Sequence, residues 1–186
     1  VIGRRFSVEL LQKLMGQTQE ELGRQLRELS NAQMIVEEST TIYAFRHALT
    51  REAIYQDILG LERRALHKLI AFALEQNQVG PRETSLNDLS YHFFEAAEWE
   101  KAFEYSRRGG ERAQSLDATR AALLHFTRAL DAAHHLGMKP PVDVWRARGQ
   151  SHQTLGNFEA ARADYEDILL IARESQDRET EWRSLL

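Results

Sequence analysis

The sequence contains no cysteine, and only three of its 186 residues are proline. Without cysteine, the chain cannot form a disulfide, use a thiolate nucleophile or build a cysteine-ligated zinc site, and its composition fits a reducing compartment. No run in the sequence approaches the roughly 18 apolar residues of a membrane span, and no basic segment followed by an apolar one opens the chain. These absences predict a globular, cytoplasmic protein that does not enter a membrane.

The sequence also lacks an excess of positive charge. Residues 1–80 carry ten Lys and Arg against ten Asp and Glu, and residues 81–186 carry fourteen against eighteen. A nucleic-acid-binding face must be basic, because neutralised phosphates release the counterions that supply most of the affinity. The charge balance therefore disfavours nucleic acid as a partner.

Motifs of catalysis and metal binding are missing as well. The chain has no G-x-x-x-x-G-K-[ST] loop to hold nucleotide phosphates and no nucleophile elbow, so we expect no ATP hydrolysis and no catalytic residue in it. Its seven histidines include no pair at helical i, i+4 spacing, and the adjacent His134 and His135 diverge by about 100° on a helix. We therefore predict no metal site and no enzyme activity in this chain.

Two short helices are predicted at the start of the sequence. A helical spacing of apolar residues begins after Ser7 and stops at Gly16. Thr18 and Glu21 then form a capping box, in which each side chain satisfies the other residue's free amide, for a helix that runs to about Ala32.

A β-hairpin and further helices follow. The segments "MIVEE" and "IYAFR" have the β-branched and aromatic content of strands, and the polar "STT" separates them. After His47 the apolar spacing is helical again, with a break near Gly60. The order helix, helix, hairpin, helix is that of a winged-helix unit, so we predict an N-terminally truncated winged-helix-like domain over residues 1–76. The polar segment "QNQVGPRET" predicts a linker over residues 77–84.

The remainder, residues 85–186, is predicted to be entirely helical. Apolar residues recur every three or four positions in five stretches, which cover residues 86–97, 99–116, 118–136, 142–155 and 158–172. Trp182 and the closing leucines predict the start of a further, truncated helix. Short turns between helices of similar length favour antiparallel neighbours.

The last two complete helices contain a recurring pattern. Its residues resemble the tetratricopeptide consensus, and they are Trp145, Gly149, His152, Gly156, Phe158, Ala161 and Tyr165. The resemblance implies an antiparallel helical solenoid, and the spacing of Ala102, Ala122 and Ala161 indicates a degenerate repeat. The aromatic residues are expected to fill the core between helices, and they are Trp99, Tyr105, Trp145, Phe158 and Tyr165. Helix phase suggests Asn87, Ser90 and Arg148 as partner-binding positions on the concave face.

Several segments together resemble one known family. "VIGRRFSVELLQKLMG", "ELGRQLRELSNAQMIVEE", "YAFRHALTREAIYQDILGLERRALHKLIAFALE" and "LSYHFFEAAEWEKAFEYSRRGGERA" resemble, in this order, the region after the ATPase module in bacterial signal-transduction ATPases with numerous domains. The similarity covers roughly residues 1–136. Such regulators often carry LuxR-type DNA-binding domains or class III nucleotide cyclases.

The segment "FRHALTREAIY" resembles the Met-His-Asp segment of the related NB-ARC switches, with His47 at the position of the histidine. In that family the histidine contacts the β-phosphate of bound ADP and holds the inactive state. Arg46 replaces the methionine and Ala48 replaces the aspartate. Because a helix N-terminus attracts anions, a histidine placed there can add a hydrogen bond to a phosphate oxygen.

The resemblance implies a non-catalytic regulatory fragment, cut from a longer chain at both ends. ATP and ADP are then cofactors of the full-length protein only, the upstream ATPase module is one partner, and a protein, peptide or small effector binds the repeats. The alternative is a constitutive protein-interaction scaffold without a nucleotide switch. A DNA-reading role is disfavoured, since Arg24 and Arg27 in the second helix are outnumbered by Glu20, Glu21 and Glu28.

Overall fold

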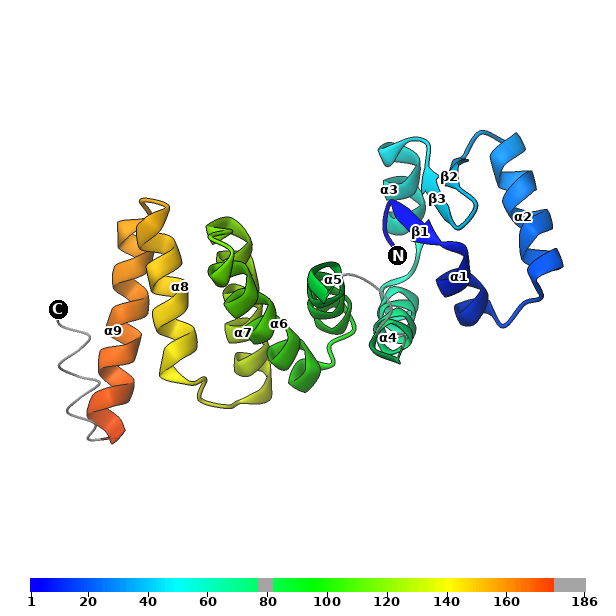
Figure 1. The fold of residues 1–186 in the computed structure, drawn as a ribbon. Coiled ribbons are helices and arrows are strands. Elements are labelled where there is room, and N and C mark those ends of the chain that lie inside the picture. The colour runs from blue at the N-terminus through cyan, green and yellow to red at the C-terminus, as the bar shows by residue number, and fades with distance from the viewer. Residues whose placement is uncertain (77–81, 176–186) are drawn as a thin grey trace. The chain divides into compact units, whose positions relative to one another are not determined.

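A computed structural model describes residues 1–76 and 82–175 of the chain (Figure 1). The chain divides into two compact units, Val1–Val79 and Gly80–Leu186, which we call unit 1 and unit 2. The fold is mainly helical and includes one small antiparallel sheet, as the sequence predicted. Among the helices described, none has the length and apolar character that crossing a bilayer requires.

Unit 1 contains the sheet and four helices of the described region. In chain order its elements are β1 (Arg5–Ser7), α1 (Val8–Met15), α2 (Gln19–Asn31), β2 (Ile35–Ser39), β3 (Ile42–Phe45), α3 (Ala48–Asp57) and α4 (Gly60–Gln76).

The sheet has the strand order β1-β3-β2, with both neighbouring pairs antiparallel. Phe6 of β1 lies opposite Tyr43 of β3, and Ile35 of β2 lies opposite Phe45. The predicted hairpin is confirmed as β2 and β3, whereas β1 was not predicted. This strand has only three residues, too few to show an alternating pattern, and it exists through its pairing with a segment far along the chain.

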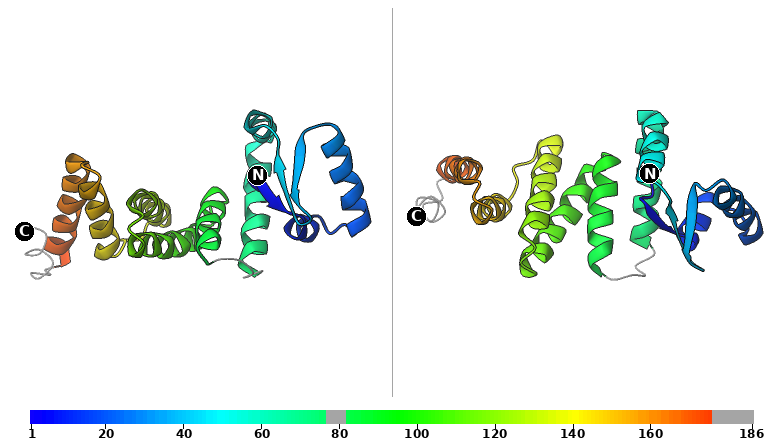
Figure 2. Two further views of the ribbon diagram at one scale, coloured as in Figure 1. Left: turned by 45° about the horizontal axis from the view of Figure 1, so that its top comes forward. Right: turned by 90° about the horizontal axis from the view of Figure 1, so that it is seen from above.

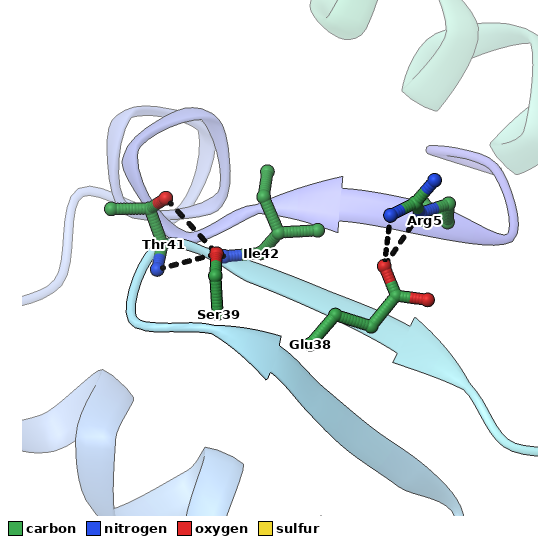
Figure 3. A network of polar contacts seen from close by, with 5 residues as sticks. All are labelled: Arg5, Glu38, Ser39, Thr41 and Ile42. Carbon is green, nitrogen blue, oxygen red and sulfur yellow. Dashed lines mark hydrogen bonds and ion pairs between the residues drawn. The ribbon is translucent and has the colours of Figure 1, made fainter.

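Side-chain hydrogen bonds close the hairpin turn and join the outer strands (Figure 3). The Ser39 hydroxyl oxygen accepts hydrogen bonds from the backbone amides of Thr41 at 3.3 Å and Ile42 at 3.1 Å. Arg5 on β1 reaches across β3 and donates from Nε to a carboxylate oxygen of Glu38 on β2 at 2.6 Å. This serine turn replaces the glycine-rich turn that the sequence lacks.

The first two helices begin and end as the sequence predicted. The Ser7 hydroxyl caps α1 by accepting from the Leu10 amide at 3.1 Å, and Gly16 ends the helix in the left-handed conformation. In α2 the capping box is present, with Thr18 accepting from the Glu21 amide at 3.3 Å and donating its own amide to the Glu21 carboxylate at 3.1 Å.

The apolar side chains of α2 face the sheet. The core of unit 1 consists of buried residues from β1, α2 and β2, with Tyr43 and Phe45 of β3 packed against it. The buried residues are Phe6, Leu22, Leu26 and Ile35. The exposed face of α2 carries its glutamates, so the helix is amphipathic in the ordinary way.

Unit 2 consists, in its described part, of five helices joined mostly by short turns. They are α5 (Arg82–Glu95), α6 (Trp99–Ser115), α7 (Thr119–Leu136), α8 (Val142–Thr154) and α9 (Phe158–Ser175). Each helix packs against the next one in the chain, and Figure 2 shows α8 and α9 side by side. All five predicted helical stretches are confirmed. Helix α5 begins at Arg82, inside the predicted 77–84 linker, and the prediction for Trp182 lies outside the described residues.

The core of unit 2 is built from small residues and a few large ones. Its buried residues come from α6, α7 and α8, and they are Ala113, Ala122, Phe126, Ala129, Leu130 and Val144. A methyl group on Gly110 of α6 would lie only 2.6 Å from the Phe126 ring, so the helices approach closely where the ring fills the space. On α8, a methyl group on Gly149 would lie 3.2 Å from the Tyr165 ring.

Four of the five aromatic residues predicted to fill the helix interfaces are partly buried there, and Phe158 is not. Trp99 stacks on His135 of α7 with ring centroids 4.0 Å apart, and Tyr105 stacks on the buried Phe93 of α5. Phe158, the first residue of α9, is 68% exposed. The prediction of a core role for Phe158 is therefore wrong for the described part of unit 2.

Candidate functional site

The predicted switch histidine lies on the surface of unit 1, between the sheet and a helix. His47 is the N-cap residue of α3, with extended backbone angles (φ −123°, ψ 129°), and its side chain makes no capping hydrogen bond. The His47 side chain is exposed. The backbone carbonyl of His47 accepts the first hydrogen bond of the helix, from the Arg51 amide at 3.4 Å. The imidazole and the free amides at the start of α3 are thus both accessible.

The backbone on the sheet side of His47 is firmly held. The Phe45 amide donates to the Arg4 carbonyl at 2.9 Å, and the Arg46 amide donates to the Met34 carbonyl at 3.0 Å. These bonds join the end of β3 to the residues before β1 and β2. The direction in which α3 starts is therefore fixed by the sheet.

Two arginine side chains lie against Tyr55 of α3. The guanidinium carbons of Arg51 and Arg63 lie 5.7 Å and 5.1 Å from the centroid of the Tyr55 ring, so the ring makes a cation–π contact with each arginine. Arg51 pairs with Glu52 at 3.5 Å, and its Nε is buried without a hydrogen-bond partner among the described residues. Such a surrounding favours an anion near α3.

A buried histidine also contacts Tyr55. His67 of α4 is only 1% exposed, and its Nε2 lies 3.2 Å from the Tyr55 hydroxyl. Burial, followed by the positive charges of the chain's amino terminus and the two arginines, lowers the pKa of His67 to about 4. His67 is therefore neutral at pH 7, and it supports Tyr55 without adding to the local charge.

The surface of α3 and α4 carries more exposed apolar side chains than any comparable stretch of the described chain. We call these residues the α3–α4 apolar surface, and they are Leu49, Ile54, Leu59, Leu61, Leu66 and Leu69. Leu49 and Leu61 are 84% and 82% exposed. The apolar spacing predicted these helices correctly, but these side chains do not face the core of unit 1. Exposed apolar surface of this kind is typical of interaction sites.

The three residues predicted to contact a partner in unit 2 are in different surroundings. Asn87 is exposed on α5 and remains a candidate. Ser90 is completely buried, and Arg148 is 19% exposed and engaged by Asp164 of α9 through contacts of 2.5 Å and 3.0 Å. Helix phase alone placed Ser90 and Arg148 on the groove, but both point into helix interfaces, so we withdraw them as groove residues.

Ser90 belongs to a buried polar network that no sequence pattern predicted. Arg128 of α7 donates to the Ser90 hydroxyl oxygen at 3.3 Å, and the hydroxyl lies 3.1 Å from Nδ1 of His125. Burial, and then the Arg128 charge, lower the pKa of His125, so the imidazole beside the Ser90 hydroxyl is neutral at pH 7. A serine and a histidine this deeply buried cannot meet a substrate, and we assign them a structural role.

A metal-binding cluster is not found in the described ranges: no group of three potential ligands is arranged to hold an ion. The adjacent His134 and His135 rings are 6.1 Å apart and nearly perpendicular, as expected for neighbours on a helix.

Comparisons with known proteins add one relative. The chain is 28% identical over 140 residues to an uncharacterized protein of Rhizobium meliloti (strain 1021). The matched residues make up 72% of this chain and 14% of the relative, so the chain spans about one seventh of that protein's length. No family model matches the chain. No solved structure matches it either.

Proposed function

We infer that this chain is a regulatory segment of a nucleotide-switched signalling protein. In this proposal unit 1 is a winged-helix-like relay that senses the state of an ATPase module earlier in a longer polypeptide. Unit 2 is a tetratricopeptide-like solenoid that binds the effector. An effector shifts the module between its ADP-bound and ATP-bound states only if it binds the two states with different affinity.

The observation that carries the proposal is the exposed, uncapped His47 at the start of α3. The helix amides and the imidazole together form a surface suited to a phosphate oxygen, and Arg51 and Arg63, which both contact Tyr55 of α3, add positive charge to these helices. The chain itself has no phosphate-binding loop, so the nucleotide would be held mainly by the neighbouring module.

The α3–α4 apolar surface supports the same arrangement. A relay must contact the module whose state it senses, and exposed leucines are available on α3, which starts at His47, and on α4; they are Leu49 and Leu61. Burying leucines in such a contact contributes about 1.5–3 kcal/mol each when the side chain becomes fully covered. The repeat proposal for unit 2 is supported by helices that pack in chain order and by Gly110 and Gly149 lying against aromatic rings.

The experiment is a measurement of ADP release from a longer polypeptide that includes an ATPase module ahead of this chain. Replacing His47 with alanine removes one hydrogen bond to a charged phosphate, which is worth about 1.5–3 kcal/mol, so ADP should dissociate roughly 10- to 100-fold faster. The exposed His134 in unit 2 provides a matched control, since His134→Ala should leave the rate unchanged. Equal ADP release from the His47→Ala variant and the unaltered protein would contradict the switch and leave a constitutive scaffold.

A further inference from the structure

We propose that unit 2 holds an extended peptide that presents one basic and one apolar side chain, in two pockets that meet at Gln153 of α8. The inference rests on the proposed function, because it gives the chemical class of the effector that the repeats bind. It follows from the lining of the two pockets, from their charge and from the exposed aromatic ring beside them.

The first pocket lies among the end of α6, the start of α7 and the last turns of α8, and has a volume of about 340 Å³. Its lining is almost entirely polar, and consists of Gln114, Asp117, Thr119, Ala122, Gln150, Ser151, Gln153 and Thr154. This volume lies at the lower end of the range for small-molecule pockets, which run from about 300 to 1,000 Å³. It suits one side chain and the peptide groups next to it.

The polar groups of the first pocket are suited to peptide bonds. Gln114 donates from its amide nitrogen to the amide oxygen of Gln150 at 3.3 Å, which orients both side chains. The hydroxyls of Ser151 and Thr154 donate to backbone carbonyls of α8 at 2.8 Å and 2.9 Å. The remaining glutamine N–H groups and oxygens can donate to and accept from a peptide group, which also carries one donor and one acceptor.

Charge selects the side chain that enters the first pocket. Asp117 is the one ionisable residue in the lining, and no basic residue lines the pocket. Residues 81–186 carry eighteen acidic and fourteen basic side chains, so this part of the chain has no excess of positive charge to attract an anion. A carboxylate or phosphate would be repelled, whereas a lysine or arginine side chain would find a counter-charge.

The second pocket provides an apolar site next to the first. It has a volume of about 370 Å³, lies along α9 and shares Gln153 with the first pocket. Phe158, Tyr165 and Leu169 give it an apolar wall, while Arg162 and Glu166 pair with each other at 2.7 Å across one turn. The Phe158 ring, which is 68% exposed and does not belong to the core, would contact the apolar side chain of the peptide here.

Gln153 connects the two pockets, so one extended chain can use both. Its carboxamide can hold the peptide group between a basic side chain beside Asp117 and an apolar side chain beside Phe158. A helical partner is less suitable, because its backbone amides are already bonded within the helix and could not use the glutamines.

The test uses the complete 186-residue chain, labelled with ¹⁵N, and blocked synthetic peptides. The probes are Lys-Ala-Leu, Glu-Ala-Leu and Lys-Ala-Ser, each made with one, two or three central alanines. Binding is followed through the side-chain amide signals of Gln114, Gln150 and Gln153. We expect Lys-Ala-Leu at its best spacing to bind about fivefold more tightly than the glutamate peptide and about tenfold more tightly than the serine peptide.

Two substitutions assign the preferences to the pockets. Asp117 has a positive φ of 55°, a conformation that asparagine tolerates well, so Asp117→Asn removes the charge without straining the turn. This variant should lose the preference for lysine over glutamate, whereas Asp131→Asn on α7 should keep it. Phe158→Ala should lose the preference for leucine over serine, and Leu170→Ala, which removes another exposed side chain of α9, should keep it.

The outcomes decide between the alternatives. The proposal is overturned if no peptide moves the three glutamine signals at millimolar concentration, if the glutamate peptide binds more tightly, or if both preferences survive in the pocket variants. Two-dimensional spectra of each variant establish that it is folded before titration. None of these measurements involves nucleotide, so a negative result leaves the His47 experiment unaffected. The ADP release rate, in turn, does not test peptide binding by unit 2.

Discussion

Gly109 and Gly110 in α6 lie where the aromatic side chains of α7 leave no space. A methyl group at these positions would lie 2.7 Å from the His125 ring and 2.6 Å from the Phe126 ring, both shorter than carbon atoms tolerate. Rigid rings cannot turn aside as a flexible side chain would. These two glycines therefore set the distance between α6 and α7.

We expect Gly110→Ala to destabilise unit 2 by about 1–3 kcal/mol, because overpacking outweighs the better helix propensity of alanine. Gly23 in the middle of α2 is the control, since a methyl group there would meet no atom closer than 3.8 Å. Gly23→Ala should raise stability by about 0.5–1 kcal/mol. Urea unfolding measures both effects, and a Gly110→Ala variant as stable as the unaltered chain would contradict the close approach.

The pair of Arg148 and Asp164 joins α8 to α9. Asp164 is 3% exposed, and Arg148 also lies over the Trp145 ring at 5.1 Å. Removing either partner leaves the other charge in a poorly solvated place.

We expect Asp164→Ala to lower stability by about 3 kcal/mol, and the double variant with Arg148→Met to lose less than the sum of the two single changes. A double-mutant cycle by thermal or chemical unfolding measures this coupling. Purely additive losses would show that the two side chains do not support each other. The exposed Arg162 and Glu166 pair on the same helix provides a comparison that should contribute well under 1 kcal/mol.

At the scale of elements, α3 and α4 with the short segment between them carry more exposed apolar side chains than the other described helices. We expect Leu49→Gln combined with Leu61→Gln to change the stability of unit 1 by no more than about 0.5 kcal/mol, because both side chains are already in water. Leu26→Ala in the core should cost about 2–5 kcal/mol. Chemical unfolding followed by circular dichroism compares them. A large loss in the double variant would mean that these leucines are packed in the isolated chain.

The same helices show what the sequence could reveal. Apolar residues at every third or fourth position, Thr18 with Glu21, and Gly16 are local signals, so the helices and their ends were predicted well. Spacing cannot tell which neighbour covers a face, and for this reason Phe158 was expected to lie in the core. The strand β1 depends on a partner about 40 residues away, and no local signal marks it.

The candidate sites divide in the same way. His47 could be found because a strand-to-helix junction is a local feature, and the structure places it on the surface. Ser90 and Arg148 are polar residues whose partners, His125 and Asp164, lie on other helices. Helix phase treats a polar residue as exposed, and only the three-dimensional arrangement shows that a partner satisfies it inside.

At the scale of the whole molecule, each unit contains a buried histidine that is less easily protonated than a free one. Both His67 in unit 1 and His125 in unit 2 have a lowered pKa. In the unfolded chain a histidine takes up its proton near pH 6.5, so acid favours unfolding as soon as the pH falls below that value. The stabilisation by neutral His67 is complete above pH 6.5 and is lost progressively toward pH 4.

We expect unit 1 to lose on the order of 2 kcal/mol between pH 7 and pH 5 through His67. His67→Gln keeps a hydrogen-bonding partner for Tyr55 but cannot titrate, so its stability should change much less over the same range. Urea unfolding at several pH values, followed by circular dichroism, gives both curves. Parallel curves for the two proteins would show that His67 does not control the acid response.

The tryptophans of the chain are confined to one of its two units. Every tryptophan of the chain, Trp99, Trp145 and Trp182, falls within residues 80–186, and the first 79 residues have none. Intrinsic tryptophan fluorescence therefore reports on unit 2 alone and gives no signal from unit 1. A spectroscopist can watch one half melt, or respond to an added compound, without attaching any dye.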